Sequence, residues 1–136
     1  MKYSVVFSSK TGNTQQLANA ITSLLPESDL IYFGPPSECA LQADRFYIGF
    51  WTDKGHCNAE IADFLKHLKG KDIFLFGTAG FGGSAEYFKK ILTAVENYIG
   101  QQQYCDWQLH VSRPHAAICA RALYKDEKQP AAYSKH

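Results

Sequence analysis

The stretch that decides the fold is residues 3–14, Tyr-Ser-Val-Val-Phe-Ser-Ser-Lys-Thr-Gly-Asn-Thr, near the start of a chain of 136 residues. Its β-branched and aromatic first part, Tyr3 to Phe7, predicts a strand. A polar loop, residues 8–14, follows. Apolar residues then recur at the spacing of one helix face, at Leu17, Ile21, Leu24 and Leu25, up to Pro26. The stretch therefore predicts a strand that passes through a polar loop into a helix.

The same alternation continues along the chain. Further apolar runs predict strands at residues 30–33, 45–50, 73–76 and 107–111, and helical stripes predict helices at residues 61–68, 88–99 and 116–125. About one turn of helix fits between the second and third strands, at residues 37–41. Strands that alternate with helices are typical of a parallel sheet covered on both faces. We therefore expect one three-layer, doubly wound α/β domain over residues 1–136, with five parallel strands and a very short second helix.

Composition excludes several classes of function. Lys and Arg number 14 against 13 Asp and Glu, a formal charge of +1, so the chain lacks the excess of cations that a nucleic-acid groove or a polybasic membrane surface needs. No apolar run approaches the roughly 20 residues of a membrane span, and the N-terminal run is too short for a signal peptide. The 4 cysteines include no C-x-x-C pair, which favours free thiols over a metal site. We expect a cytoplasmic monomer that binds no nucleic acid and no metal.

The first loop has the composition of an anion site. Residues 8–14 hold four hydroxyl side chains, an amide and Gly12 between a strand and a helix. Hydroxyl groups and backbone N–H groups at a helix N-terminus bind phosphate, and glycine lets the backbone approach it closely. The Walker A and G-x-G-x-x-G patterns are absent, so the loop predicts a site for a terminal phosphate. The alternative is a hydroxyl-rich helix cap, which needs only one such residue.

Two further loops have unusual composition, at residues 51–57 and 78–83. In a doubly wound sheet, ligands bind beyond the carboxyl ends of the strands, where the strand order reverses. That rule selects these two loops together with residues 8–14. A planar ring beside a phosphate is the kind of ligand that their aromatic and glycine residues suit.

The first loop also carries a family resemblance. The run Ser9-Lys10-Thr11-Gly12-Asn13-Thr14 after a first strand resembles the phosphate-binding loop of flavodoxins, [ST]-x-T-G-x-T. The resemblance covers residues 2–111 in order and spacing. It implies the strand order 2-1-3-4-5 and the cofactor FMN, with its phosphate on these six residues.

In flavodoxins the second loop supplies an aromatic or apolar wall for the flavin ring. Trp51 stands at that place here and is followed by Thr52, Asp53, Lys54 and Gly55. The resemblance implies that these residues border the ring, and that Gly55 lets the backbone reorganise when flavin N5 gains a proton. The alternative for Trp51 is an ordinary core aromatic at a strand end.

The third loop corresponds to the second flavin-flanking loop of the family. Its candidate contacts are Thr78, Ala79, Gly80, Phe81 and Gly82. Phe81 would be the second wall of the ring site, where flavodoxins often have Tyr. Tyr87 is the alternative wall, and a tight turn with Phe81 in the core is the alternative structure.

The resemblance implies an electron carrier, in which FMN shuttles electrons between a reductase and a dedicated redox partner. No residues combine a nucleophile with a base, so the flavin would supply the chemistry. An FMN-dependent NAD(P)H reductase or oxidase acting on a small substrate is the first alternative, although 136 residues leave little room for a substrate pocket. A cofactor-free binding or regulatory protein of the same fold is the second.

Three further features of the sequence bear on function. His56 would be a pH-sensitive neighbour of the flavin and Cys57 an oxidisable thiol, or both are incidental beside a helix cap at Asn58. Residues 112–136 would form a docking surface or a solvated final helix. A charge of +1 differs from the acidic flavodoxins and favours a partner that docks by shape and apolar contact.

Overall fold

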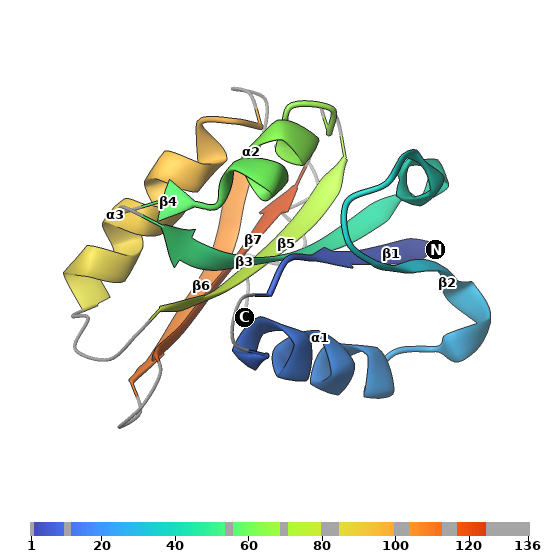
Figure 1. Cartoon of the computed structure of the whole chain (residues 1–136), viewed down its shortest axis with the longest axis horizontal. Coiled ribbons are helices and arrows are strands. Elements are labelled where there is room, and N and C mark those ends of the chain that lie inside the picture. The colour runs from blue at the N-terminus through green and yellow to red at the C-terminus, as the bar shows by residue number, and fades with distance from the viewer. Residues whose placement is uncertain are drawn as a thin grey trace.

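The structure is a computed structural model that describes residues 2–9, 12–53, 56–68, 71–79, 85–99, 104–112 and 117–124. A twisted sheet forms its middle layer (Figure 1). Helix α1 (Asn13–Ser23) covers one face of the sheet, and helices α2 (Ala59–Leu65) and α3 (Ala85–Glu96) cover the other. Among the described residues, no helix is long and apolar enough to cross a membrane.

Four parallel strands make up the first part of the sheet. They are β1 (Tyr3–Phe7), β2 (Leu30–Gly34), β3 (Arg45–Asp53) and β5 (Asp72–Ala79), and they lie side by side in the order β2-β1-β3-β5. This order matches the first four positions of the expected one. Short 3-10 helices at Glu27–Asp29 and Glu38–Gln42 flank β2. The second of them is the single turn expected between the second and third strands.

The predictions of a fifth parallel strand and of a final helix are both wrong. Strand β6 (Tyr104–Ser112) is present, but it pairs antiparallel with β7 (Ala117–Tyr124), and β7 pairs antiparallel with β5. The sheet therefore ends β5-β7-β6, and the segment expected as a helix is a strand between two others. The alanines of this segment favour a helix, but pairing with a strand on both sides overrides that propensity.

The third strand is longer than expected. Residues 51–53 were expected to begin a loop, but they continue β3 and pair with the two-residue strand β4 (His56–Cys57) as an antiparallel hairpin. In this hairpin Thr52 lies opposite Cys57, and Asp53 lies opposite His56. The second loop is therefore a hairpin that projects from the carboxyl end of β3.

The core lies on both faces of the sheet. The face under α2 and α3 buries Phe46, Ile48, Phe50 and the apolar stripe of α2, including Ile61 and Leu65. The face under α1 has a smaller buried set. Leu24, expected to join the apolar stripe of α1, lies beyond its last residue and is 85% exposed, because the helix ends one residue earlier.

Candidate functional site

The three loops selected from the sequence lie at one end of the sheet. The start of α1, the β3–β4 hairpin and the end of β5 all lie toward the left of Figure 1. This is the carboxyl end of β1, β3 and β5, which run parallel. The chain thus brings together segments that are up to 64 residues apart in sequence, at the edge where ligands bind in sheets of this kind.

The first loop directs N–H groups toward one point. Gly12 caps α1 with φ 92° and ψ −12°, in the left-handed region. Its N–H donates to Ser9 Oγ at 3.0 Å, and the N–H of Gln15 donates to the same oxygen at 3.4 Å. A Cβ built on Gly12 meets nothing within 4 Å. Among the described residues, two N–H groups at the start of the helix thus share one hydroxyl oxygen, and nothing crowds a Cβ at Gly12.

Three threonine hydroxyls connect the loops. Thr14 Oγ1 lies 2.9 Å from Thr78 Oγ1, and it donates to the carbonyl of Phe50 at 3.4 Å. Thr52 Oγ1 donates to the carbonyl of Thr78 at 3.0 Å. Thr14 belongs to α1, Thr52 to β3 and Thr78 to β5. We call these three residues the threonine link, because their hydrogen bonds connect the start of α1 with the ends of β3 and β5.

Two strand glycines allow this close approach. A Cβ on Gly49 would lie 2.5 Å from the Phe76 ring and 3.0 Å from Thr14 Cγ2. A Cβ on Gly77 would lie 2.3 Å from the Phe50 ring. Both glycines therefore make room for side chains that support the site, Phe76 and Thr14 on one face and Phe50 on the other.

Trp51 lies at the second loop without belonging to the core. It pairs with Thr78 across β3 and β5 and is half-buried. Neither core cluster includes it, whereas its neighbour Phe50 is fully buried. An indole that packing leaves partly open at this edge suits contact with a planar ring.

The described residues include nine of the sixteen predicted contacts. Ser9, Gly12, Asn13 and Thr14 form the start of α1, Trp51, Thr52 and Asp53 end β3, and Thr78 and Ala79 end β5. The other seven lie outside the described residues: Lys10, Thr11, Lys54, Gly55, Gly80, Phe81 and Gly82. Tyr87, the alternative ring wall, lies in the first turn of α3 and is exposed.

Sequence reasoning missed four residues that build this end of the sheet. Gly49 and Gly77 make room for the packing, the Phe50 carbonyl accepts from Thr14, and the Gln15 N–H joins the Ser9 contact. Glycine inside an apolar strand run is the signal that marks a close approach. No sequence signal marks a backbone carbonyl or N–H.

Cys57 is a core residue. It is fully buried under α2 and α3, and burial raises the pKa of its thiol to about 11. A thiol of such high pKa is a poor nucleophile at neutral pH. The role of Cys57 as an oxidisable thiol is therefore not supported. His56 precedes it in β4, and Asn58 caps α2.

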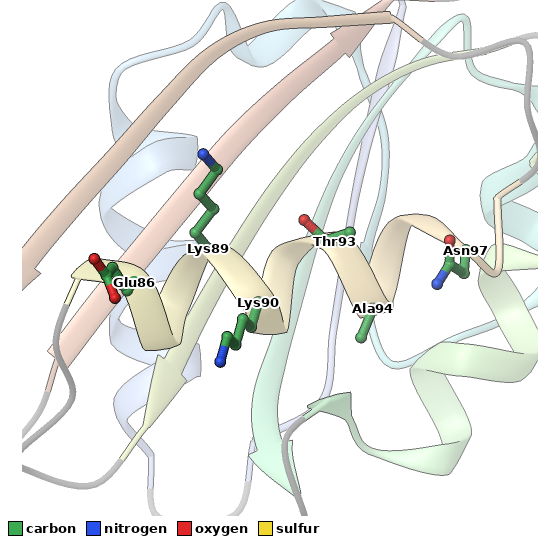
Figure 2. A pocket seen from close by; sticks show the side chains of 6 residues that line it. All are labelled: Glu86, Lys89, Lys90, Thr93, Ala94 and Asn97. Carbon is green, nitrogen blue, oxygen red and sulfur yellow. The ribbon is translucent and has the colours of Figure 1, made fainter.

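One surface hollow lies away from the predicted contacts. It measures about 570 Å³, and its described lining comes from α3 and the residue after it: Glu86, Lys89, Lys90, Thr93, Ala94 and Asn97. Figure 2 shows that these side chains spread over the helix in several directions instead of converging on one point. Within the described ranges, no group of His, Cys, Asp and Glu could hold a metal ion. The described lining of the hollow therefore offers no set of side chains that converge on a ligand.

Similar proteins give independent information. The sequence model of the flavodoxin domain matches residues 4–106. The flavodoxin-like domain-containing protein BilS of Clostridium symbiosum (strain WAL-14163) is 41% identical over 111 residues, which is 69% of this chain and 58% of that protein. BilS of Clostridioides difficile (strain CD3) is 32% identical over 106 residues, 73% of this chain and 58% of that protein. The chain thus spans less than two thirds of these curated relatives.

A solved structure of a flavodoxin from the domain Archaea is also similar to the chain. It has a TM-score of 0.48 and 21% sequence identity, over 74% of this chain and 76% of that one.

Proposed function

The chain belongs to the flavodoxin-domain family, and from this premise we propose that it binds FMN and carries electrons between a reductase and a dedicated redox partner. The observation that carries the proposal is the start of α1, where the N–H groups of Gly12 and Gln15 gather on Ser9 Oγ beside open space. FMN supplies the one- and two-electron chemistry when it is bound. The protein positions it and excludes water from part of its ring.

The start of α1 fits a phosphate group. The first N–H groups of a helix have no acceptor within it, and the helix dipole favours an anion there. Among the described residues, nothing lies within 4 Å of a Cβ built on Gly12. A phosphate oxygen would therefore replace or join Ser9 Oγ as the acceptor of the Gly12 and Gln15 N–H groups.

The β3–β4 hairpin and the end of β5 fit the ring. Trp51 is half-buried at the carboxyl end of β3, where its indole would border the isoalloxazine. Thr52 fixes the hairpin to β5 through its bond to the Thr78 carbonyl. The ring site is thereby held on two paired strands, which are more rigid than an isolated loop.

The charge of the chain bears on its partner. A net charge of +1 provides little long-range attraction to a basic or acidic protein surface. We therefore propose that the partner docks by shape and apolar contact around the exposed edge of the flavin. Electron transfer to that partner should then depend only weakly on ionic strength.

The test uses the purified chain with FMN under anaerobic conditions. We expect FMN to bind with a shifted visible spectrum and quenched fluorescence. NAD(P)H alone should leave the bound flavin oxidised, and addition of a flavodoxin reductase should reduce it. A chain that takes up no FMN would overturn the proposal. Repeated turnover with NAD(P)H alone would overturn the carrier role and show a reductase instead.

A further inference from the structure

We propose that the exposed face of the first half of α3 is a docking surface for an acidic redox partner, and that Lys89 and Lys90 contact carboxylates of that partner. This inference rests on the proposed function, because it names the kind of protein that exchanges electrons with the bound flavin. The position of α3, the contacts of its lysines and the side chains around them support it.

Helix α3 lies beside the proposed ring site. It begins at Ala85, shortly after β5 ends at Ala79, and it packs beside β4, the second strand of the hairpin that also includes Trp51. Figure 1 shows that the start of α3 lies at the same end of the sheet as this hairpin and the end of β5. An electron passes between two redox centres only over a short distance. A partner that approaches the ring therefore covers the first half of α3.

Lys89 and Lys90 differ from the other described cations. Both are exposed, and neither has a hydrogen bond or an ion pair with another described residue. Glu86 precedes them at the spacing of helical ion pairs, yet none of the described ion pairs joins it to either lysine. The other described Lys and Arg side chains each contact an oxygen atom, in Lys2–Asp29, Arg45–Asp72, Lys66–Asp63 and Lys71–Ala43. The two ammonium groups of α3 are thus available to a partner.

The surroundings of the two lysines suit a protein surface. Tyr87 is 43% exposed in the same part of the helix, and tyrosine is enriched in protein interfaces. Glu86 is the one carboxylate in the described lining of the hollow on α3. Figure 2 shows that Lys89 and Lys90 point to different sides of the helix, so they match separate carboxylates on a broad surface. Two lysines are too few for a nucleic-acid or membrane surface.

The lysines act only at contact range. The net charge of +1 provides little attraction at a distance, and ion pairs at an exposed rim are individually weak. Shape and apolar contact bring the two proteins together, and the lysines then favour an acidic partner over a basic one. The dependence of electron transfer on ionic strength stays small for the same reason.

The first test joins the purified chain to rubredoxin, a small acidic iron protein, with a carbodiimide that links carboxylates to lysine amines. Peptide mass mapping then identifies the linked lysines. We expect most cross-links at Lys89 and Lys90, and few at Lys2 and Lys66, whose side chains are 56% and 59% exposed. Cross-links that spread evenly over the lysines, or that gather on other ones, would overturn the inference.

The second test measures electron transfer. The bound flavin is reduced with light and EDTA, and it then passes one electron to the ferric iron of rubredoxin, which becomes ferrous. The double variant Lys89→Glu and Lys90→Glu should lower this rate about fivefold at low salt and leave the affinity for FMN unchanged.

The matched control is the double variant Lys2→Glu and Lys66→Glu, which has the same net charge and should keep the rate within about twofold. Equal losses in the two double variants would show that only net charge matters. That result, or an unchanged rate in the α3 variant, would overturn the inference.

A chain that binds no FMN would overturn the proposed function separately. Cross-linking needs no flavin, so it still tests the docking surface on the apoprotein. Preferential links to Lys89 and Lys90 would then keep α3 as a surface for an acidic protein, and an even pattern would reject it.

Discussion

The two faces of the sheet are packed differently. Under α2 and α3, the described side chains form a large cluster in which Phe46, Ile48 and Phe50 are fully buried. Under α1, the buried set is smaller, and half-buried aromatics such as Phe33 and Phe74 lie around it. The first face therefore contributes more of the apolar burial that stabilises the fold.

The two faces also differ in what they support: one mainly stabilises the fold, and the other carries the proposed phosphate site. The face under α1 carries the helix whose start is the proposed phosphate site, and Thr14 joins that helix to β3 and β5. Fewer buried contacts hold α1, so single polar contacts have a larger share in fixing its position. We expect changes under α2 and α3 to alter stability, and changes at the start of α1 to alter FMN affinity.

The largest expected effect is on stability. Phe46 is fully buried and contacts the ring of Phe64, with ring centroids 6.2 Å apart. Phe46→Ala should lower the free energy of unfolding by roughly 3–5 kcal/mol, measured by urea unfolding. Phe33→Ala is the matched variant on the other face, where the ring is half-buried, and it should cost clearly less. Equal losses would contradict the difference between the faces.

The next prediction compares how a change on each face of the sheet alters the affinity for FMN. Gly49→Ala and Gly77→Ala each drive a Cβ into an aromatic ring, and each should destabilise the fold by about 1–3 kcal/mol. Only the Cβ of Gly49 would also press on Thr14, at 3.0 Å. Gly49→Ala should therefore lower the affinity for FMN more than Gly77→Ala does. The measurement is a fluorescence titration with FMN under conditions in which both variants are folded. The reverse order would indicate that a shift of Thr14 does not reach the phosphate site.

A smaller effect has the opposite sign. Within the described part of the chain, the buried hydroxyl of Tyr3 has no hydrogen-bond partner. Tyr3→Phe removes that polar group from the face under α1 and should leave stability unchanged or raise it by up to about 1 kcal/mol at pH 7. A loss above about 1 kcal/mol would show that the hydroxyl is bonded.

The pH dependence of stability checks the same residue. Burial, and then the charges of Tyr47, Asp29 and Glu27, raise the pKa of Tyr3 above 10.0. The unfolded chain then loses this proton first as the pH rises, so the free energy of unfolding should fall above pH 10. Tyr3→Phe should flatten that fall in alkaline unfolding curves. An identical slope in both proteins would contradict the burial of this hydroxyl.

The smallest effect concerns reactivity alone. Cys57 is buried with a pKa of about 11, and Cys39 is exposed. At pH 8, iodoacetamide followed by peptide mass mapping should label Cys39 quickly and Cys57 only after unfolding. The contribution of Cys57 to stability is complete below pH 9 and is lost toward pH 11. Rapid labelling of Cys57 in the folded chain would contradict a closed core under α2 and α3.

Short sequence patterns predicted those strands and helices whose residues follow one another directly in the chain. The run from Tyr3 through Gly12 to Leu17 predicted β1, the loop and α1, because strand, glycine and helix signals follow one another directly. The stripe that includes Ile61 and Leu65 predicted α2 for the same reason. The alignment of the three loops followed from the rule for parallel sheets.

Long-range pairing could not be predicted. Residues 117–124 have a composition compatible with a helix, and only the free edges of β5 and β6 make them a strand. The bond between Thr14 and Thr78 joins residues 64 positions apart, so no local pattern indicates it. Such contacts depend on which segments the fold brings together, and that information is not local.

Titration of the apoprotein with FMN and riboflavin side by side tests the central claim most directly, because the two ligands differ only in the phosphate. A phosphate held by the N–H groups at the start of α1 predicts that FMN binds about 100-fold more tightly or better. Gly12→Val, which strains a backbone at φ 92° and fills the open space, should remove most of that advantage. Equal affinity of FMN and riboflavin for the unmodified chain would contradict the phosphate site at the start of α1.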